Sequence, residues 1–446
     1  MRRRTRRVKV KKIRLVVVLL VLVILSSRAI AAHRIRSAQQ PHPGPNTPAV
    51  TKPTNTPLPP LPNFVVRSAV LMEATTGQIL FEQNADQSLP TASTAKIMTM
   101  RLAFRAIKEG RLSLEREVYA PPEIIRSVPW DSSLMYINPG SSVKVRDLLF
   151  GLAVDSGNDA AVVIANAIAG SVPAFVDQMN AEAAALGMKQ THFVDPHGYS
   201  PATRASARDM AALTRAYLRD APESLEYHSA QSFTYGKDTR TGESIIQYNH
   251  NYLLWDYEGA DGLKTGFTDQ AGYNLLATAK RNGVRVLGVV MGVPSRGVGS
   301  LRGMAYRDQV MTTLLDRGFA MVAPVEVPGT ATASSVTTYK GTKSHVTVAP
   351  AETVIVPQIR GKELPVTTRV ELSKTYLVAP VARGQAVGTL VVMLGGKEYL
   401  RLNLVTTEAV KRGGFIKVMW DSMGLALAPL VHRGLGVVTR SVPAGR

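Results

Sequence analysis

Three short motifs carry the residue types of nucleophilic acyl chemistry, and the first is Ser93-Thr94-Ala95-Lys96. Residues three apart on a helix share a face, so the Lys96 amine can meet the Ser93 hydroxyl. A partly buried lysine beside other cations has a lowered pKa and can accept the serine proton. The pair predicts a serine nucleophile with a lysine base, although the same spacing also fits a capping serine and a solvated lysine.

The second and third motifs supply groups that could handle a substrate. Ser156-Gly157-Asn158 offers a hydroxyl that can relay a proton and an amide that can hold a carbonyl. Lys264-Thr265-Gly266 offers a cation and a hydroxyl for a carboxylate, and its glycine permits close backbone approach to a strand. Each motif alone also describes an ordinary turn or cap. Separations of 63 and 108 residues fit a nucleophile helix, a central connection and an edge strand.

The segments around these motifs predict an α+β domain over residues 64–322, an antiparallel sheet with a helical cluster. Strands are expected at 65–72 and 77–81, and again at 273–280 and 284–292, where Asn282-Gly283 is a strong hairpin signal. Apolar spacing near 3.6 predicts helices at 93–108, 145–154, 158–169, 172–187, 206–219 and 309–319.

The remainder of the chain has a different character. Residues 323–408 alternate short Val/Thr/Leu runs with Pro/Gly turns, which predicts a small all-β domain. Residues 411–433 contain a helix-like stretch, 415–427, with Ile416 and Trp420 on one face and lysines nearby. This pattern is typical of an amphipathic helix lying at a membrane surface, and the alternative is a helix packed on the protein's own core.

The N-terminus predicts export. Residues 1–31 combine a basic stretch, an eleven-residue apolar run and Ala29-Ile30-Ala31, as in a cleaved signal peptide. An uncleaved signal anchor is the alternative. Residues 41–63 are rich in proline and threonine and predict an extended linker. The folded part should therefore work outside the cytoplasm, in a periplasm or on the outer face of the cytoplasmic membrane.

The net charge of +20 is concentrated at the two ends of the chain. Residues 1–40 hold twelve Lys/Arg and no acid, and residues 411–446 carry a net +5, which leaves about +3 on the 370 residues between them. A nearly neutral body argues against nucleic-acid binding and favours contact of the ends with anionic lipid. The absence of cysteine excludes disulfides and thiol catalysis.

Taken together, the motifs resemble those of penicillin-recognising serine enzymes, whose set is S-x-x-K, S-D-N and K-T-G. The chain is similar to the D-alanyl-D-alanine carboxypeptidases, which are low-molecular-mass penicillin-binding proteins. The similarity extends over about residues 64–427 and includes His197-Gly198, the segments 206–210 and 249–255, and the layout of peptidase domain, β domain and C-terminal helix.

The resemblance implies roles for individual residues. Ser93 attacks the carbonyl between the last two D-alanines of a peptidoglycan stem peptide, and Lys96 accepts its proton. Ser156 and Asn158 assist proton transfer and positioning. The carboxylate is held by Lys264 and Thr265 beside Gly266, and the oxyanion hole is formed by the backbone N–H groups of Ser93 and Phe267. β-Lactams acylate Ser93, and neither metal nor other cofactor is required.

Two positions depart from the family pattern or are ambiguous. Phe267 stands where some carboxypeptidases have histidine, so that side chain's contribution is lost. The family also has an arginine near the carboxylate site, after the terminal hairpin. Arg307 is the best match by distance from the following apolar residues, and Arg296 and Arg302 compete with it.

Three other functions remain open from the sequence. A β-lactamase of class A would need an added glutamate, and none of Glu182, Glu223, Glu226 and Glu243 has a Glu-x-x-Leu-Asn setting. An endopeptidase on cell-wall cross-links could use the same site. An inactive wall-binding protein could keep the fold without the chemistry.

Overall fold

The computed structural model describes residues 58–237, 241–295, 300–327, 333–427 and 437–442. The expected signal segment at 1–31, most of the linker, Arg296 and the end of the expected C-terminal helix, 428–433, lie outside these ranges. Residues 58–63 contain neither helix nor strand.

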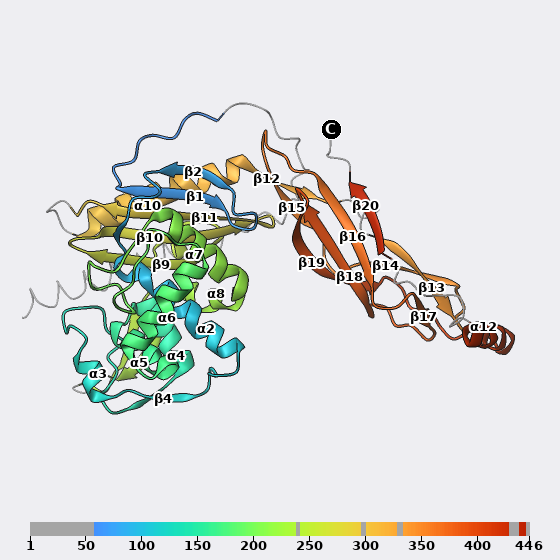
Figure 1. The fold of residues 1–446 in the computed structure, drawn as a ribbon, viewed down its shortest axis with the longest axis horizontal. Coiled ribbons are helices and arrows are strands. Elements are labelled where there is room, and N and C mark those ends of the chain that lie inside the picture. Colours follow the sequence, from blue (N-terminus) through green and yellow to red (C-terminus); the bar gives the residue numbers. More distant parts are fainter. Residues whose placement is uncertain (1–57, 238–240, 296–299, 328–332, 428–436, 443–446) are drawn as a thin grey trace, which may run out of the picture. The chain divides into compact units, whose positions relative to one another are not determined.

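A five-stranded antiparallel sheet forms the frame of the N-terminal domain (Figure 1), in the order β2-β1-β11-β10-β9. Its strands are β1 (Ser68–Glu73), β2 (Ile79–Gln83), β9 (Ala260–Thr268), β10 (Gly272–Arg281) and β11 (Val284–Val293). The expected hairpin joins β10 to β11 through Asn282 and Gly283, whose φ angles of 49° and 80° are those of a type I′ turn. Lys264-Thr265-Gly266 therefore lies in β9, at the edge of the sheet.

Helices cover both faces of this sheet. One face packs against α10 (Ser300–Met321) and the other against a cluster whose main helices follow. These are α2 (Lys96–Lys108), α4 (Val145–Phe150), α5 (Asn158–Ala169), α6 (Val172–Ala185) and α7 (Ala207–Asp220). Side chains alternate across a strand, so Leu275 of β10 joins the α10 core and Leu276 joins the cluster core. The expected α+β architecture is confirmed.

Several short elements complete the domain, and most of them were not expected from the sequence. A 3₁₀ turn, η1 (Ala92–Ala95), precedes α2, and a π-helical turn, η2 (Gly151–Asp155), follows α4. A separate hairpin pairs β7 (Ser232–Lys237) with β8 (Ser244–Tyr248). The remaining ones are β3 (Leu89–Pro90), β4 (Glu117–Tyr119), α3 (Pro122–Arg126), β5 (Ser142–Lys144), β6 (Arg204–Ala205), η3 (Pro222–Ser224), α8 (Leu225–His228) and α9 (Leu253–Asp256).

The C-terminal part is all-β, as expected. A two-stranded sheet pairs β12 (Val322–Glu326) with β15 (Ile355–Ile359), and a seven-stranded sheet has the order β17-β13-β14-β19-β18-β16-β20. Its strands are β13 (Ser334–Tyr339), β14 (His345–Pro350), β16 (Val366–Leu372), β17 (Tyr376–Val378), β18 (Ala386–Leu394), β19 (Lys397–Thr406) and β20 (Val437–Val442). Buried valines and leucines such as Leu390 and Leu404 form its core. The edge strand β20 was not expected.

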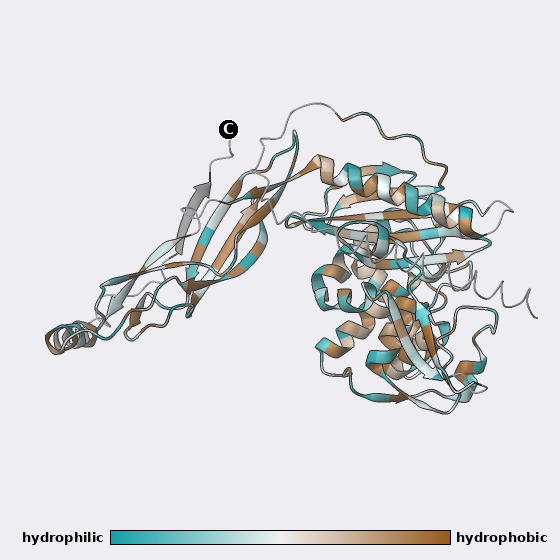
Figure 2. Ribbon diagram, turned by 180° about the vertical axis from the view of Figure 1, so that it is seen from behind, coloured by the Kyte–Doolittle hydropathy of each residue, from teal (hydrophilic) through white to brown (hydrophobic). Residues whose placement is uncertain are grey.

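The helix α12 (Phe415–Leu427) has the bounds expected for the amphipathic stretch. It carries hydrophobic and hydrophilic residues side by side (Figure 2). In the described part of the chain, no single helix has the length and apolarity to cross a membrane. The bent pair α5 and α6 satisfies length and composition together, but eight of the residues of α5 are buried inside the protein.

Candidate active site

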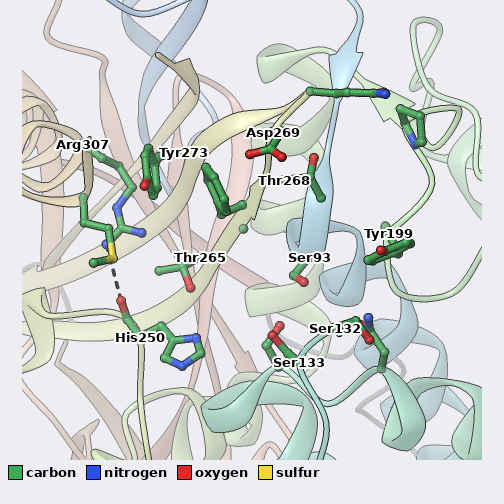
Figure 3. A pocket seen from close by; sticks show the side chains of 18 of the residues that line it. Ser93, Ser132, Ser133, Tyr199, His250, Thr265, Thr268, Asp269, Tyr273 and Arg307 are labelled. Carbon is green, nitrogen blue, oxygen red and sulfur yellow. Dashed lines mark hydrogen bonds between the residues drawn. The ribbon is translucent and has the colours of Figure 1, made fainter. Parts of the chain in front are cut away.

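The three motifs meet at one cavity of about 740 Å³ beside the edge strand β9. Figure 3 shows Ser93 among Thr265, Ser133 and Tyr199, which come from different segments of the chain. Of the site residues expected from the sequence, those that line the cavity are Ser93, Ser156, Asn158, Thr265, Gly266, Phe267 and Arg307, whereas Lys96 and Lys264 are buried and do not line it. Its size is that of a site for a small substrate.

Ser93 and Lys96 are brought together across the junction of two helix types. Ser93 lies in η1 and Lys96 is the first residue of α2, and Lys96 Nζ is 3.0 Å from Ser93 Oγ. Lys96 is fully buried, and its Nζ also lies 2.6 Å from Asn158 Oδ1 and 3.1 Å from the carbonyl oxygen of His197. Asn158 of the second motif and the backbone of His197 thus both orient the Lys96 amine.

The surroundings of Lys96 favour a neutral amine. Burial lowers its pKa well below the ordinary value, and the positive charge of Lys264 lowers it further. A neutral amine has two N–H groups and one lone pair. Donation to Asn158 Oδ1 and to the His197 carbonyl uses both N–H groups, because those atoms are acceptors only. The lone pair is then left to accept the proton of Ser93, which is the geometry of a general base.

The second motif occupies a constrained turn. Ser156 ends the π-helical turn with a φ of 65°, and its buried Oγ has no hydrogen-bond partner among the described residues. The next helix begins at Asn158, whose N–H donates to the carbonyl of Ser133. The Asp159 carboxylate accepts from the backbone N–H groups of Met135 and Ile137. These bonds hold the turn and the facing loop together.

The third motif places the backbone of Gly266 against the nucleophile and a buried lysine two residues before it. A Cβ on Gly266 would lie 2.9 Å from the backbone nitrogen of Ser93. Only glycine therefore allows β9 to approach Ser93 so closely. Lys264 is 2% exposed, and its Nζ donates to the carbonyl of Thr265. Burial, together with the charge of Arg307, lowers the pKa of Lys264 to about 7.

The structure separates the candidate arginines. Arg307 of α10 is 2% exposed, lines the cavity and donates to Asp308 and to the carbonyl of His250. Arg302 lines a different cavity, of about 330 Å³. Among the described candidates, Arg307 is the one that lines the same cavity as Ser93.

Phe267 follows the third motif and faces the cavity. Its side chain is 44% exposed and stacks on Tyr273, with ring centroids 4.3 Å apart. The side chain thus forms an apolar wall, and the backbone N–H of Phe267 remains part of β9.

Comparison with known proteins assigns the chain to a family. A family model described as D-alanyl-D-alanine carboxypeptidase matches residues 54–295, and a second, for the C-terminal domain of penicillin-binding protein 5, matches residues 327–412. The chain belongs to the D-alanyl-D-alanine carboxypeptidase family. The sequence resemblance and the expected serine-type hydrolase class are thereby confirmed.

Individual relatives are similar over most of the chain. The D-alanyl-D-alanine carboxypeptidase DacA of Haemophilus influenzae is 36% identical over 374 residues, which are 83% of this chain and 91% of that protein. DacC of Escherichia coli is 34% identical over 365 residues, 81% of this chain and 88% of that protein. The crystal structure of penicillin-binding protein 5 from Haemophilus influenzae has 36% identity and a TM-score of 0.57, and covers 80% of this chain and all of that one.

The structure also reveals positioning residues that motif spacing had missed. Asn274 of β10 donates to the carbonyls of Pro90 and Thr91, which ties the sheet to the start of η1. The buried His228 of α8 hydrogen-bonds the Leu263 carbonyl, next to Lys264, at 3.0 Å. Its other ring nitrogen bonds the Tyr217 hydroxyl at 3.1 Å. No local pattern marks these side chains, because their partners lie far away in the sequence.

Proposed function

We propose that this chain removes the terminal D-alanine from peptidoglycan stem peptides through an acyl-enzyme on Ser93. The observation that carries the proposal is the position of Lys96 Nζ, between Ser93 Oγ, Asn158 Oδ1 and the His197 carbonyl. Membership of the carboxypeptidase family supports the choice of a D-alanyl peptide as substrate.

The first half of the reaction forms the acyl-enzyme. Ser93 Oγ attacks the carbonyl carbon of the penultimate D-alanine while its proton passes to Lys96. The backbone N–H groups of Ser93 and Phe267 stabilise the oxyanion. The C–N bond then breaks, and D-alanine leaves with a proton relayed through Lys96 and Ser156. Water attacks the ester in the second half, and Ser93 regains its proton.

Substrate orientation comes from the carboxylate end. Thr265 and Arg307 line the β9 and α10 side of the cavity and supply a hydroxyl and a cation, and the buried Lys264 amine lies directly before Thr265 in β9. A charge-assisted bond to a carboxylate is stronger than a neutral one and sets the register of the peptide. The scissile carbonyl is then placed over Ser93.

β-Lactams carry the same two features, a reactive carbonyl and a carboxylate, and should acylate Ser93. Penicillin-binding protein D2 of Listeria monocytogenes was solved in its ampicillin-bound form. That structure is 29% identical to this chain with a TM-score of 0.50, and it covers 58% of this chain and all of that one. No glutamate is among the described residues that line the cavity of this chain, and Glu182 pairs with Arg101 and Arg105. The β-lactamase alternative therefore lacks its extra base there.

The test is a labelled penicillin together with a D-alanyl-D-alanine pentapeptide. The wild-type protein should take up label and release D-alanine, and Ser93→Ala should do neither. Label that persists in Ser93→Ala refutes the nucleophile. Lys96→Ala with normal acylation refutes the base, provided that its thermal unfolding matches that of Ser93→Ala. Cross-linked muropeptide dimers distinguish the endopeptidase alternative, which converts them to monomers.

We propose further that the protein is exported and that α12 binds the outer surface of the cytoplasmic membrane. In support, α12 exposes a set of large apolar side chains whose exposed fractions are 82%, 69% and 63% for Phe415, Ile416 and Trp420. Exposed apolar side chains that lie next to one another are typical of an interaction surface. The basic and apolar segment at residues 1–31 supports export.

Vesicle sedimentation tests the membrane contact. A protein lacking residues 1–31 should bind vesicles with anionic lipid, and the triple variant Phe415→Ser, Ile416→Ser, Trp420→Ser should stay in the supernatant. The matched control is the exposed Leu301→Ser on α10, which should bind like wild type. Equal binding of the triple variant would exclude α12 as the contact.

A further inference from the structure

One side chain outside the three motifs holds the arginine of the cavity. Arg307 of α10 is 2% exposed and lines the cavity. The next residue, Asp308, accepts a hydrogen bond from Arg307 Nε at 2.8 Å, and the same carboxylate oxygen lies 2.7 Å from Arg307 Nη2. An unpaired buried charge is costly, so a guanidinium taken out of water needs such a partner. Asp308 is therefore the counter-ion of Arg307.

The contact between Arg307 and Asp308 is not a default contact of a helix surface. Successive residues of an α-helix do not face each other, whereas residues three or four apart do. Met304 and Arg307 have the latter spacing, and both line the cavity. The Arg307 and Asp308 side chains are 2% and 16% exposed, so solvent and salt screen their attraction only weakly. Burial raises the pKa of Asp308, and the charge of Arg307 opposes that rise and favours the carboxylate.

The donors of Arg307 divide into those that anchor the side chain and those that remain for a ligand. A guanidinium has five N–H groups in one plane. Asp308 takes the Nε–H and one N–H of Nη2, and the His250 carbonyl lies 3.4 Å from Nη2 (Figure 3). Among the described residues, none accepts a hydrogen bond from Nη1. The two N–H groups of Nη1 thus remain for an anion in the cavity.

The rigid shape of the guanidinium links these two sets of donors. Because the group is planar, fixing the edge formed by Nε and Nη2 also fixes the direction of Nη1. Of the two anchors, the Asp308 contact is the shorter, and it involves both nitrogens of that edge. Without Asp308, the long Arg307 side chain would keep only the 3.4 Å contact with the His250 carbonyl. The direction of Nη1 therefore depends mainly on Asp308.

We propose that Asp308 is the positioning residue that aims Arg307 Nη1 at the substrate, and that it thereby sets the preference for a leaving group that ends in a carboxylate. Asp308 acts through Arg307, and the inference rests on the proposed function, in which Arg307 binds that carboxylate. Removal of Asp308 has two opposed effects, since it frees the Arg307 side chain and also removes a negative charge. The loss of alignment outweighs the change in charge, because a charge-assisted bond to a carboxylate depends on direction as well as on attraction.

The test compares two thioester substrates that differ only in the leaving group. Both contain an N-acyl-D-alanine whose carbonyl carbon is bonded to sulfur. The leaving thiol is thioglycolate in one, which ends in a carboxylate, and thioglycolamide in the other. In both, the bond from Ser93 Oγ to the carbonyl carbon forms, the C–S bond breaks, and water hydrolyses the same acyl-enzyme. The released thiol is measured with an aromatic disulfide, which does not react with the protein itself because the chain has no cysteine.

The measured quantity is the ratio of kcat/KM for the carboxylate thioester to kcat/KM for the amide thioester. The ratio should be well above one in wild type. Asp308→Ala should lower it about 5-fold, through the carboxylate thioester alone. Asp308→Asn keeps an oxygen that can accept from Arg307, and its ratio should fall only about 2-fold. The matched control is Asp316→Ala, which removes an exposed carboxylate of the same helix that accepts from the Tyr257 hydroxyl, and it should keep the wild-type ratio.

An unchanged ratio in Asp308→Ala overturns the proposal, even if kcat/KM falls equally for both thioesters, because an equal fall indicates a structural role. A higher ratio also overturns it, since Asp308 would then only weaken the charge of Arg307. If Asp308→Ala does not fold, Asp308→Asn decides, and a wild-type ratio in that variant has the same meaning. If wild type hydrolyses neither thioester, the proposed function fails instead, so the two failures are distinguishable.

Discussion

Gly198 offers the sharpest test of how the fold holds the nucleophile and its base. It has a φ of +78°, and a Cβ built on it would lie 1.8 Å from the carbonyl oxygen of Ala92 and 2.6 Å from its carbonyl carbon. Ala92 precedes Ser93, and the residue before Gly198 is His197, whose carbonyl accepts from Lys96. Gly198→Ala therefore perturbs both ends of the Ser93–Lys96 contact.

The magnitude follows from these distances. A left-handed conformation costs a non-glycine residue about 1–2 kcal/mol. A carbon and a carbonyl oxygen approach no closer than about 3.3 Å in proteins, so the backbone must move by roughly 1.5 Å. A displacement of about 1 Å at a catalytic group can reduce the rate about 100-fold. Gly198→Ala should thus lower the acylation rate by at least about 100-fold in addition to its loss of stability.

Gly170 supplies the matched control. It ends α5 with a φ of +77°, and a Cβ there would have nothing within 4 Å. Gly170→Ala should lose about 1–2 kcal/mol of stability, a fall of several degrees in Tm, and keep its acylation rate. The measurements are thermal unfolding and the rate of labelling by penicillin. Equal Tm and equal rate in the two variants would refute the reasoning, whereas a lower Tm in Gly198→Ala supports the clash even if labelling is too slow to follow.

Three further predictions concern separate parts of the domain. Burial lowers the pKa of His228 to about 3, below its unfolded value near 6.5. Below pH 6.5 the unfolded chain therefore binds one more proton than the folded one, and the free energy of unfolding falls by about 1.4 kcal/mol per pH unit. Urea unfolding from pH 8 to 5 should show a shallower decline of that free energy in His228→Gln, and a decline equal to that of the wild type would contradict this. Arg307→Gln should reduce kcat/KM for the pentapeptide by about 10-fold or more, because a lost charge-assisted bond costs about 1.5–3 kcal/mol. Arg302→Gln should match wild type. A loss of kcat/KM in Arg302→Gln but not in Arg307→Gln would show that Arg302, not Arg307, binds the carboxylate. Gly266→Ala places a Cβ 2.9 Å from the Ser93 nitrogen and should abolish labelling and lower the Tm, because the backbone must shift to relieve the contact. Normal labelling would show that β9 does not constrain Ser93.

Local patterns in the sequence determined many of the helices and turns of this protein. Helices such as α5 and α12 begin and end where apolar spacing predicts, because that spacing reflects which face is buried. The Asn282-Gly283 turn follows from backbone conformations that few other residues adopt. The order of the three motifs indicated the family because it resembles that of known members, and the chemistry of each motif alone did not. By contrast, the β7–β8 hairpin has alternating half-exposed residues and no strong apolar signal, so it was missed.

Only the tertiary structure decided how the motif residues act. Lys96 meets Asn158 across 62 residues and His197 across 101, and no spacing rule reports such contacts. The choice of Arg307 over Arg302 depends on which face of α10 meets the cavity. The shifted pKa values of Lys96, Lys264 and Asp155 arise from burial and from charges that folding brings near. The sequence specifies which groups exist and which local elements carry them. Desolvation and the distances between charges arise only when the chain packs. These two quantities set the pKa of a buried lysine and so decide whether its amine is neutral and can act as a base, or is charged.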